Sequence, residues 1–587
     1  MLEKFRLRLA TTNALPQLAL MAVISGLLAG TVILAFRYLV EVLQTLYLPA
    51  GHTESYEQLA PFLRLLIPTL GGLLLGLLWQ RARPEDRHVG VVHVMERLAY
   101  HQGHLPWRSA IYQFFGATIC LASGHSVGRE GPSVHLGAAS GSLLGQGLAL
   151  PNNSIRTLVA CGTAAAIAAS FNTPLAGVVF AMEVVMMEYT IVGFTPVIIA
   201  AVIGAVMTVS VYGPLPAFVV PPLCLTTPFL EMFYLVIVGV VIGLTAALFI
   251  HALQFFSKLW RQYPLWQRTT AAGLFTGIIA LFIPEVMGVG YDTVNAAFLG
   301  QLSLDLMIGL VIFKLLATTF GLGMGLPAGL IGPTLVIGAG IGGIMGLLVE
   351  VFFPGQVAQH ALYAMLGMGA MMGATLQAPL AALIALLELT NNPNLILPGM
   401  LVIVVANLVA NNPPLKKDSV FIILMRARGL EYWHDPISQS LSRIGVAGVM
   451  ERNVTVLPRY LSPKTAKEIV QKHPVWIIVE EENQRRTLLR AADLARFIEK
   501  EKTLLLNPSS PTQKIDLLEI PAERLQLVPI ELQASLLEAL QIFEQKQAEA
   551  IYIVRRVRAT VITPIYGILT HQSIETYYRS SLTQQLK

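Results

Sequence analysis

Long apolar runs follow one another along the first three quarters of the chain and alternate with short polar segments. The run over residues 18–40 is long enough to cross the hydrocarbon core of a bilayer, which takes about 20 helical residues. Later runs, such as 111–122 and 380–389, are shorter, and glycine or proline stands close to them. Short, interrupted helices are stable at membrane depth only where protein buries them or where they line a wet cavity. The pattern predicts an all-α polytopic membrane protein with broken or re-entrant helices.

Charged residues divide the chain into two parts. They make up only 13% of the sequence, about half of what a soluble protein carries, and none occurs over residues 131–155 or 189–230. After Arg426 they become frequent. We therefore predict a membrane domain over residues 1–430 and a smaller water-soluble domain over residues 440–587.

The charge balance and the start of the chain indicate the location. A net charge of +5 is small for 587 residues and does not favour nucleic acid as a partner. Lys4, Arg6 and Arg8 precede the first apolar run, so the positive-inside rule predicts cytoplasmic termini. That run is too long for the core of a cleaved signal, and the three cysteines are too irregularly spaced for a disulfide or metal framework. We expect a multi-pass protein of the cell membrane, embedded in the lipid bilayer of a bacterial inner membrane.

The segment Gly128-Arg129-Glu130-Gly131-Pro132 carries the candidate chemistry. It places two charges between apolar flanks, although a charge at the bilayer centre costs at least about 2.5–3.5 kcal/mol. Glycines on both sides of Glu130 allow the backbone to leave helical geometry, and Pro132 suits the first turn of a new helix. Such a restart points free N–H groups and the positive end of a helix dipole at an anion. Glu130 is itself an anion there, so it can compete with a mobile ion as a gate, or simply cap the helix.

An internal repeat supports this interpretation. Two motifs occur twice: Gly-Pro at 131–132 and 332–333, and Pro-Leu-Ala with a glutamate nine residues after the proline at 174–183 and 379–388. The two offsets, 333 − 132 = 201 and 379 − 174 = 205, are nearly equal. Matched features at one offset indicate a duplicated unit, with halves at about 17–213 and 228–425. Broken helices at corresponding positions of two halves point to a substrate site near the middle of the membrane.

At this point the chain resembles a known family. The segment at 128–132 and the segment Phe171-Asn172-Thr173-Pro174-Leu175-Ala176-Gly177 are similar to motifs of the CLC chloride channels and chloride/proton antiporters. The resemblance covers residues 18–428. It implies a homodimer with one anion path per subunit, inverted repeats, and a gating glutamate, Glu130, that leaves an anion site when it is protonated or when an anion displaces it. No enzyme is expected, since the membrane half carries no P-loop, no His/Cys metal spacing and no nucleophile elbow.

The same resemblance implies which residues bind the anion. The positions are Gly128, Arg129, Gly131, Val89, Gly90, Leu330, Ile331 and Phe421. Val89 replaces the usual serine of the family, Phe421 replaces the usual tyrosine, and Ile331 stands where a phenylalanine is usual. Two hydroxyl donors are therefore absent, and backbone N–H groups, which do not depend on the side chain, would hold the ion. We expect weak, pore-like binding of chloride, with nitrate and fluoride as open alternatives.

A proton relay separates antiporters from channels in this family. Val184 stands at the position of the usual inner relay glutamate, and valine has no proton to pass. Glu183 matches the neighbouring carboxylate of the family, and Glu188 lies one helical turn beyond Val184. We therefore predict a passive, Glu130-gated chloride channel. The alternative is a chloride/proton antiporter in which Glu130 works with Glu188 as a substitute relay.

Four further polar residues lie near these motifs. Glu388, the repeat counterpart of Glu183, is expected to have a structural role. Lys314 lies in the apolar run 308–316, and its ammonium group is expected to reach a membrane interface. His125 and His135 flank the gate segment, and for both we favour ordinary packing over a role as a pH sensor.

The water-soluble part has a two-fold αβ pattern. Short runs rich in β-branched residues at 475–479 and 550–554 follow helix-like stretches at 463–472 and 533–546. The pattern resembles a tandem pair of CBS domains, at about 443–500 and 520–580. Such pairs often bind an adenine nucleotide through an aspartate, which Asp493 supplies in the first module, whereas the second has Ser573 at that place. A dimerising or regulatory tail is therefore predicted as readily as a nucleotide-binding one, and no cofactor is predicted to be required.

Overall fold

The fold was described from a computed structural model of the chain. The structure describes residues 2–10, 14–48, 54–188, 191–214, 218, 220–221, 229–352, 360–412, 418–431, 436–481, 486–500, 514–555 and 564–577. By its internal contacts the chain forms two compact units. The first contains residues 18–148 and 155–433, and the second contains residues 1–17, 149–154 and 434–587. Each is described by itself.

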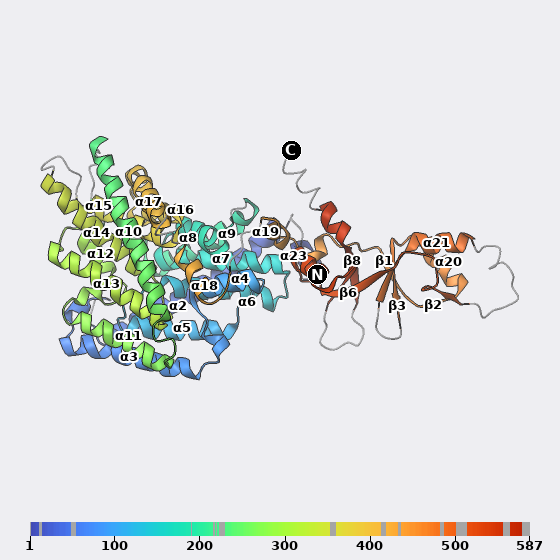
Figure 1. The fold of residues 1–587 in the computed structure, drawn as a ribbon, viewed down its shortest axis with the longest axis horizontal. Coiled ribbons are helices and arrows are strands. Elements are labelled where there is room, and N and C mark those ends of the chain that lie inside the picture. The colour runs from blue at the N-terminus through green and yellow to red at the C-terminus, as the bar shows by residue number, and fades with distance from the viewer. Residues whose placement is uncertain are drawn as a thin grey trace. The chain divides into compact units, whose positions relative to one another are not determined.

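The first unit is made of helices (Figure 1). In the described part, eight helices are long and apolar enough to cross a membrane. They are α2 (Leu15–Thr45), α3 (Pro61–Arg81), α7 (Asn152–Phe171), α9 (Ile191–Tyr212), α10 (Phe229–Lys258), α13 (Leu304–Met324), α14 (Ile331–Phe352) and α17 (Ile396–Asn411) with the turn before it. The apolar windows of α7 and α14 are 89% and 83% buried, whereas that of α3 is 28% buried. The central helices are therefore covered by protein, and the outer ones keep an apolar face for lipid.

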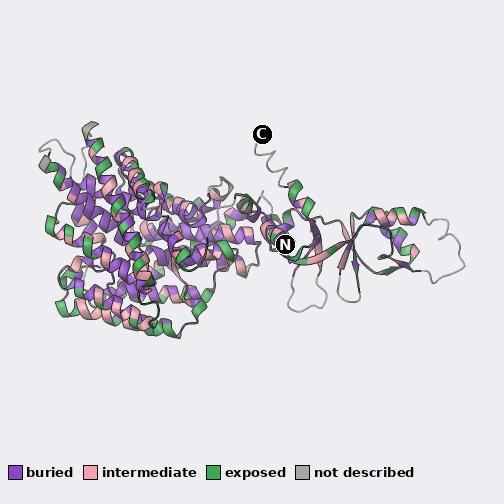
Figure 2. Cartoon of the chain, viewed as in Figure 1, coloured by how far each residue is buried: buried purple, intermediate pink, exposed green. Residues whose placement is uncertain are grey.

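Shorter helices complete the first unit, as the short apolar runs predict. They are α4 (Gly90–Tyr100), α5 (Trp107–Ala122), α6 (Glu130–Gly147), α8 (Pro174–Phe180), α11 (Leu265–Ala280), α12 (Tyr291–Phe298), α15 (His360–Leu376), α16 (Pro379–Thr390) and α18 (Val420–Ala427). In α15 every residue from Ala361 to Leu376 is buried, which is typical of a helix that is apolar on all sides. Figure 2 shows buried residues gathered in the interior of this unit and exposed ones at its margin.

The predicted repeat recurs in the packing of two helix pairs. Gly137 of α6 faces Gly162 of α7, and Gly338 of α14 faces Gly367 of α15. A Cβ atom added to Gly137 or Gly338 would lie 2.2 Å or 2.3 Å from the carbonyl oxygen of the facing glycine. Only glycine allows two helices to approach so closely. The two halves thus build equivalent contacts around the starts of α6 and α14.

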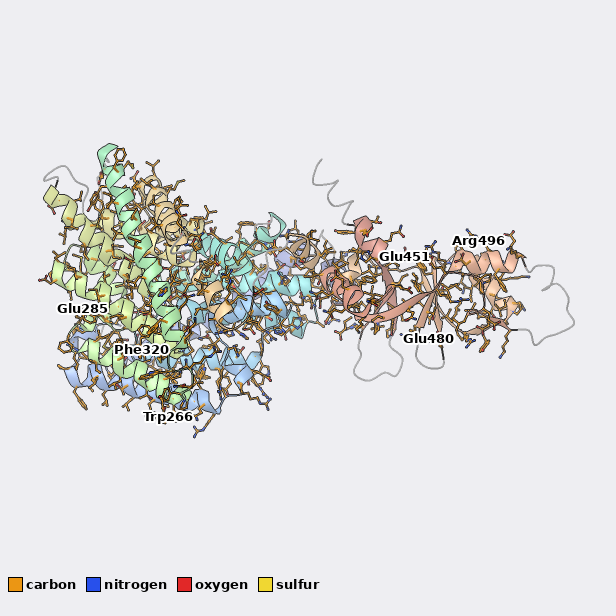
Figure 3. All side chains as sticks on the ribbon, in the orientation of Figure 1. Trp266, Glu285, Phe320, Glu451, Glu480 and Arg496 are labelled. Carbon is orange, nitrogen blue, oxygen red and sulfur yellow. The ribbon has the colours of Figure 1, made fainter. Side chains whose placement is uncertain are left out.

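The second unit holds a mixed sheet with strand order β1-β3-β4-β6-β7-β8. Its strands are β1 (Val454–Pro458), β3 (Trp476–Glu480), β4 (Arg486–Arg490), β6 (Leu525–Glu531), β7 (Ala550–Val554) and β8 (Ile565–Thr570). In each half a strand and a helix lead to a parallel strand and then to an antiparallel one. The helices are α20 (Pro463–Gln471) after β1 and α23 (Leu536–Lys546) after β6, and α21 (Ala491–Lys500) follows β4. Figure 3 labels Glu480 and Arg496 of this unit and Phe320 of the helical one.

Residues 1–17 and 149–154 have most of their contacts within the second unit. The backbone N–H of Asn152 donates to the carbonyl of Gln533 at 2.9 Å, and its side-chain amide donates to Glu538 at 2.9 Å. The hydroxyl of Ser154 donates to the carbonyl of Leu9 at 3.1 Å. The polar groups of Asn152 and Ser154 are therefore paired within the second unit.

Candidate functional site

The site is built where the two glycine-rich helix starts meet. The N–H of Gly128 donates to the carbonyl of Gly329 at 2.7 Å, and the N–H of Gly329 donates back to the carbonyl of Gly128 at 2.7 Å. This antiparallel bridge brings Glu130, the first residue of α6, beside Ile331, the first residue of α14. One helix start from each repeat, with its free N–H groups, therefore faces the same point.

The carboxylate of Glu130 occupies the space at this point. The residue is 1% exposed. A Cβ atom at Gly128 would lie 1.9 Å from Oε2, a Cβ at Gly329 would lie 2.7 Å from Oε2, and a Cβ at Gly332 would lie 3.0 Å from Oε1. These three glycines therefore leave the room that the carboxylate fills. Among the described residues Oε2 has no hydrogen-bond partner, which is costly for a buried charge.

Tyr291 and Arg129 stand on one side of this carboxylate. The hydroxyl of Tyr291 donates to Oε1 of Glu130 at 3.3 Å. The Arg129 guanidinium donates to the carbonyl of Ser170 at 2.9 Å and lies 5.3 Å and 5.1 Å from the ring centres of Phe171 and Tyr291. The end of α7 therefore holds the arginine in place, so that its positive charge stays next to Glu130.

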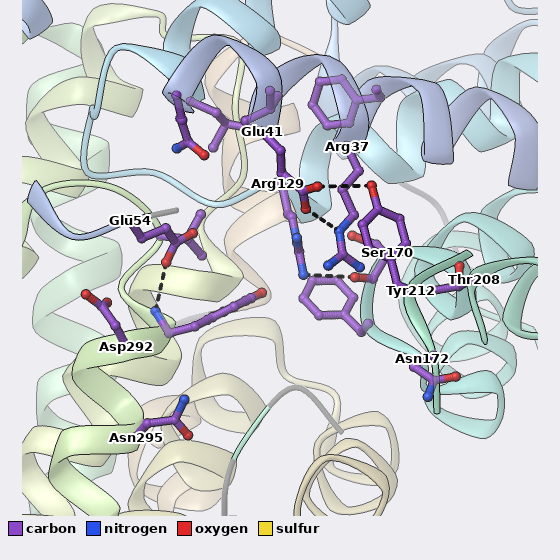
Figure 4. A pocket seen from close by; sticks show the side chains of 18 residues that line it. Arg37, Glu41, Glu54, Arg129, Ser170, Asn172, Thr208, Tyr212, Asp292 and Asn295 are labelled. Carbon is purple, nitrogen blue, oxygen red and sulfur yellow. Dashed lines mark hydrogen bonds and ion pairs between the residues drawn. The ribbon is translucent and has the colours of Figure 1, made fainter. Parts of the chain in front are cut away.

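A cavity of about 410 Å³ opens beyond Arg129 and is called the Arg129 cavity (Figure 4). Its charged lining residues are Arg37, Glu41, Glu54, Arg129 and Asp292. Arg37 pairs with Glu41 at 2.7 Å, and the carboxylate of Glu54 accepts the backbone N–H of Tyr291 at 3.2 Å. The cavity is polar and carries charges of both signs.

A second cavity of about 320 Å³, called the Val89 cavity, brings together most of the residues predicted to bind the anion. Its lining includes Val89, Gly90, Gly131, Leu330, Ile331 and Phe421. Five cations, Arg87, Lys258, Arg261, Arg268 and Arg428, also line it, and among its described lining residues there is no Asp or Glu. A concave surface lined by one sign of charge concentrates ions of the opposite sign. This cavity therefore attracts anions.

Glu130 lies between the two cavities along the chain. Arg129 lines one of them, Gly131 lines the other, and Glu130 is among the described lining residues of neither. Its two neighbours in the chain therefore line different cavities, while its own carboxylate is buried.

Among the described residues, no hydrogen bond or ion pair joins the predicted relay positions to this carboxylate. Val184 is buried in the turn of π-helix that follows α8, and Glu183 and Val184 both line a separate cavity of about 120 Å³. The carboxylate of Glu183 accepts the N–H groups of Leu380 at 3.3 Å and Ala381 at 2.6 Å, at the start of α16. Glu188 is 7% exposed and lies 3.6 Å from the Arg156 guanidinium.

Glu388 makes the mirror-image contact. Its carboxylate accepts the N–H groups of Leu175 at 3.0 Å and Ala176 at 2.7 Å, at the start of α8. Each repeat therefore supplies the N-terminal cap of a helix in the other repeat. This agrees with the structural role expected of Glu388 and gives Glu183 the same one.

The expected position of Lys314 is wrong. Its side chain is fully buried, and its ammonium donates to the carbonyls of Val286 and Gly288, at 3.0 Å each. The loop before α12 offers carbonyl oxygens that satisfy the charge inside the protein, so the group has no need to reach an interface. This loop leads directly into Tyr291, whose contact with Glu130 the sequence analysis also missed. The one signal was the pair of glycines, Gly288 and Gly290, that precede the tyrosine.

In the second unit, Asp493 lies in the first turn of α21. Its Oδ1 atom is 3.6 Å from the guanidinium of Arg496, one helical turn further on. A carboxylate paired with a neighbour in its own helix carries no sign of a ligand by itself. Adenine nucleotide binding at this residue stays a prediction.

The fold and the site define a multi-pass membrane protein in which the helix starts of two repeats meet around a buried carboxylate. Residues 71–411 match the family model described as voltage gated chloride channel, and the chain belongs to this CLC family of transporters and channels, which are not enzymes. It is 33% identical to a ClcB-like chloride channel protein of Ralstonia nicotianae, over 62% of this chain and 85% of that protein. It is 30% identical to the voltage-gated ClC-type chloride channel ClcB of Citrobacter koseri, over 68% of this chain and 97% of that protein. A solved slow cyanobacterial chloride/proton antiporter is similar in fold, with a TM-score of 0.63 and 23% identity over 70% of this chain and 97% of that one.

Proposed function

We propose that the protein is a passive chloride channel in which the Glu130 carboxylate is the gate. The observation that carries this proposal is the lining of the Val89 cavity, with five cations and no carboxylate among its described residues. Anions gather there, and the starts of α6 and α14 offer them backbone N–H groups. Glu130 occupies the next position, from which a proton or an arriving anion removes it.

Weak binding fits this role. Val89, Ile331 and Phe421 line the cavity with apolar side chains, so the ion depends on the backbone and on distant cations. The hydroxyl of Ser257, which also lines the cavity, donates to the carbonyl of Gln254 at 2.8 Å. An ion bound without close hydroxyl donors leaves quickly, which fast conduction requires.

The second candidate is a chloride/proton antiporter that uses Glu130 and Glu188. It is favoured by the burial of Glu188, which lies four residues after Val184 and just beyond the helix that ends at Met186. Against it stand the pairing of Glu188 with Arg156 and the capping role of Glu183. We therefore place the channel first and the antiporter second.

Flux through reconstituted liposomes distinguishes the two. A chloride gradient is imposed while the pH on both sides is recorded. A channel is expected to release chloride without moving protons, because no relay residue accompanies Glu130. Uphill movement of protons driven by chloride would contradict the channel and support the antiporter, and Glu188→Gln would then be expected to abolish that movement.

The remaining expectations from the family resemblance are kept as proposals. The protein is proposed to act as a homodimer with one path per subunit and with cytoplasmic termini. The tail is proposed to be a tandem CBS-like regulator at about residues 443–500 and 520–580. Its repeated strand-helix-strand-strand order supports this assignment.

A further inference from the structure

The carboxylate of Glu130 occupies a place where an anion could bind, so the groups that bond to it are the groups that would bond to that anion. Backbone N–H groups of Glu130 and Gly332 bond to this carboxylate. Among the described residues, its one side-chain hydrogen bond comes from the hydroxyl of Tyr291, which lies 3.3 Å from Oε1. An ionised carboxylate only accepts hydrogen bonds, so this hydroxyl donates. Chloride, which has no hydrogen, likewise only accepts.

The distance between the hydroxyl and the carboxylate leaves room for an ion larger than an oxygen atom. Hydrogen bonds from a hydroxyl to a charged oxygen are usually about 2.5–2.7 Å long, whereas the separation here is 3.3 Å. A halide ion has a larger radius than an oxygen atom and contacts a hydroxyl at a longer distance. Gly128, Gly329 and Gly332, which surround this place, bring no side chain into it. A halide at this place therefore contacts the hydroxyl with Tyr291 in its present position.

Tyr291 is held by contacts that do not involve Glu130. Its backbone N–H donates to Oε2 of Glu54 at 3.2 Å. Its ring packs edge-on against Phe218, with the ring centres 5.3 Å apart, and against Phe171, with the ring centres 6.2 Å apart. These contacts remain when the carboxylate leaves, so the hydroxyl stays where it is. A donor that is already in place binds an ion without the cost of ordering that donor first.

Two cations lie close to this tyrosine. The Arg129 guanidinium lies 5.1 Å from the centre of the Tyr291 ring, where its positive charge favours an anion. The ammonium of Lys314 donates to carbonyls of the loop before α12 and would lie 3.0 Å from a Cβ atom at Gly290, the residue before the tyrosine. Gly290 has a φ of +87°, a conformation that favours glycine. The loop therefore reaches Tyr291 by a fixed path.

We propose that the Tyr291 hydroxyl is a ligand of the transported chloride, at the place that Glu130 leaves when the gate opens. It supplies the hydroxyl donor that Val89 and Phe421 do not. Those two apolar residues line the Val89 cavity, whereas Tyr291 lines the Arg129 cavity. The side-chain donor for the ion is therefore found at a different position from the ones that the family resemblance indicates. The proposal rests on the function proposed above, because the place is free only once Glu130 has left it.

The test is made in a Glu130→Ala background, because alanine leaves the place free and has no side-chain group that bonds to the ion. Chloride efflux from liposomes is measured over a range of chloride concentrations, which gives the half-saturating concentration. Adding Tyr291→Phe removes one oxygen atom and keeps the ring. It is expected to raise the half-saturating concentration about tenfold, the lower end of what a hydrogen bond to a charged group contributes.

A matched control is available in Tyr212. This tyrosine lines the same Arg129 cavity, and its hydroxyl also donates to a carboxylate, Oε2 of Glu41, at 3.1 Å (Figure 4). Tyr212→Phe therefore makes the same chemical change in the same cavity but leaves the Tyr291 hydroxyl in place. Adding it to Glu130→Ala is expected to keep the half-saturating concentration of the Glu130→Ala protein.

The protein with Glu130 present distinguishes a ligand from a merely structural residue. There the hydroxyl bonds either to the carboxylate or to chloride, so Tyr291→Phe weakens both competitors alike. The half-saturating concentration is therefore expected to change much less than in the Glu130→Ala background. A structural disturbance of the helix starts would weaken chloride binding by the same factor in both backgrounds.

Two results would overturn the proposal. One is a half-saturating concentration that Tyr291→Phe does not raise in the Glu130→Ala background, and the other is an equal rise in both backgrounds. Thermal unfolding checks that each variant is folded, and Glu130→Val, which also lacks a hydrogen-bonding group, serves as the background if Glu130→Ala does not fold. A folded Glu130→Ala protein with no chloride efflux at all would instead contradict the proposed function, so the two failures can be told apart.

Discussion

A single side chain, Glu130, fills a space that glycines keep open. Substituting any of Gly128, Gly329 or Gly332 would put a carbon atom within 3.0 Å of its carboxylate oxygens. Tyr291 supplies one hydrogen bond, and Oε2 has no partner among the described residues. Backbone N–H groups of Glu130 and Gly332 also bond to this carboxylate. It therefore takes the place that an anion could take at these two helix starts.

We expect Glu130→Gln to raise chloride flux and to remove the increase in flux that acid produces in the wild-type protein. The amide has the shape of the carboxylate but carries no charge, so it imitates the protonated side chain at every pH and no longer competes with the anion. Chloride efflux from liposomes over a range of pH measures both effects. Unchanged flux with an unchanged pH response would contradict the assignment of the gate.

The sequence predicted this residue and most of its surroundings, but not all. Glu130 and the glycine loops were found because their spacing and charge are unusual in an apolar chain. Tyr291 was missed because it lies 161 residues away and reaches the carboxylate only through the tertiary fold. The position of Lys314 was predicted wrongly for the same reason. No local pattern shows that three backbone carbonyl groups of the loop before α12 accept its ammonium group inside the protein.

At the scale of elements, the two repeats are held together by exchanged caps. Glu183 accepts the first N–H groups of α16, and Glu388 accepts the first N–H groups of α8. Helix starts leave such groups unsatisfied unless a side chain reaches them. The sequence shows the two glutamates at equivalent positions of the repeat. It does not show that each one caps a helix of the other repeat.

We expect Glu183→Ala and Glu388→Ala to destabilise the protein to similar extents. Each removes one N-terminal cap, which costs about 1 kcal/mol. Thermal unfolding of the purified protein measures this change, and the two variants serve as controls for each other. Ion selectivity and proton movement are expected to stay unchanged in both. A loss confined to proton movement in Glu183→Ala would indicate a relay instead of a cap.

At the scale of the whole molecule, the chain divides into a helical unit and an αβ unit. The predicted strand at 550–554 coincides with β7, and the one at 475–479 is β3, one residue further on. The first strand of each half, β1 and β6, was not predicted, because neither has the strict alternation that marks a strand in a sequence. Fold class followed from composition and periodicity, whereas sheet order depends on pairings that no local signal specifies.

The second unit also contains a pair of short strands, β2 (Tyr460–Leu461) and β5 (Ile515–Asp516). We expect acid to weaken the pairing of these two strands. Arg459 donates to both carboxylate oxygens of Asp516, at 3.0 Å and 2.7 Å, and these hydrogen bonds hold the pKa of Asp516 below its usual range. The resulting stability is present above the ordinary carboxylate pKa of about 4. It is lost as the pH falls through the lowered value.

Hydrogen exchange in β2 and β5 measures this effect in the full chain. Acid and Asp516→Asn are both expected to speed exchange there, while the helical unit is unaffected. Asp493→Asn is a suitable control, because that carboxylate pairs at 3.6 Å with a largely exposed Arg496 in its own helix. Equal exchange in wild type and Asp516→Asn at neutral pH would contradict the prediction.

The unequal charge of the two cavities has an electrical consequence. Among the residues that the structure describes, one is lined by five cations and no carboxylate, and the other by Arg37 and Arg129 together with Glu41, Glu54 and Asp292. With the same salt on both sides, anions crowd at the first mouth and stay dilute at the second. In the proposed channel, the current is therefore expected to rectify: it is larger when the voltage drives chloride from the crowded mouth than when the voltage is reversed. Concentrated salt shortens the screening length of these charges to about 3 Å at 1 M. It is therefore expected to make the currents at opposite voltages more nearly equal.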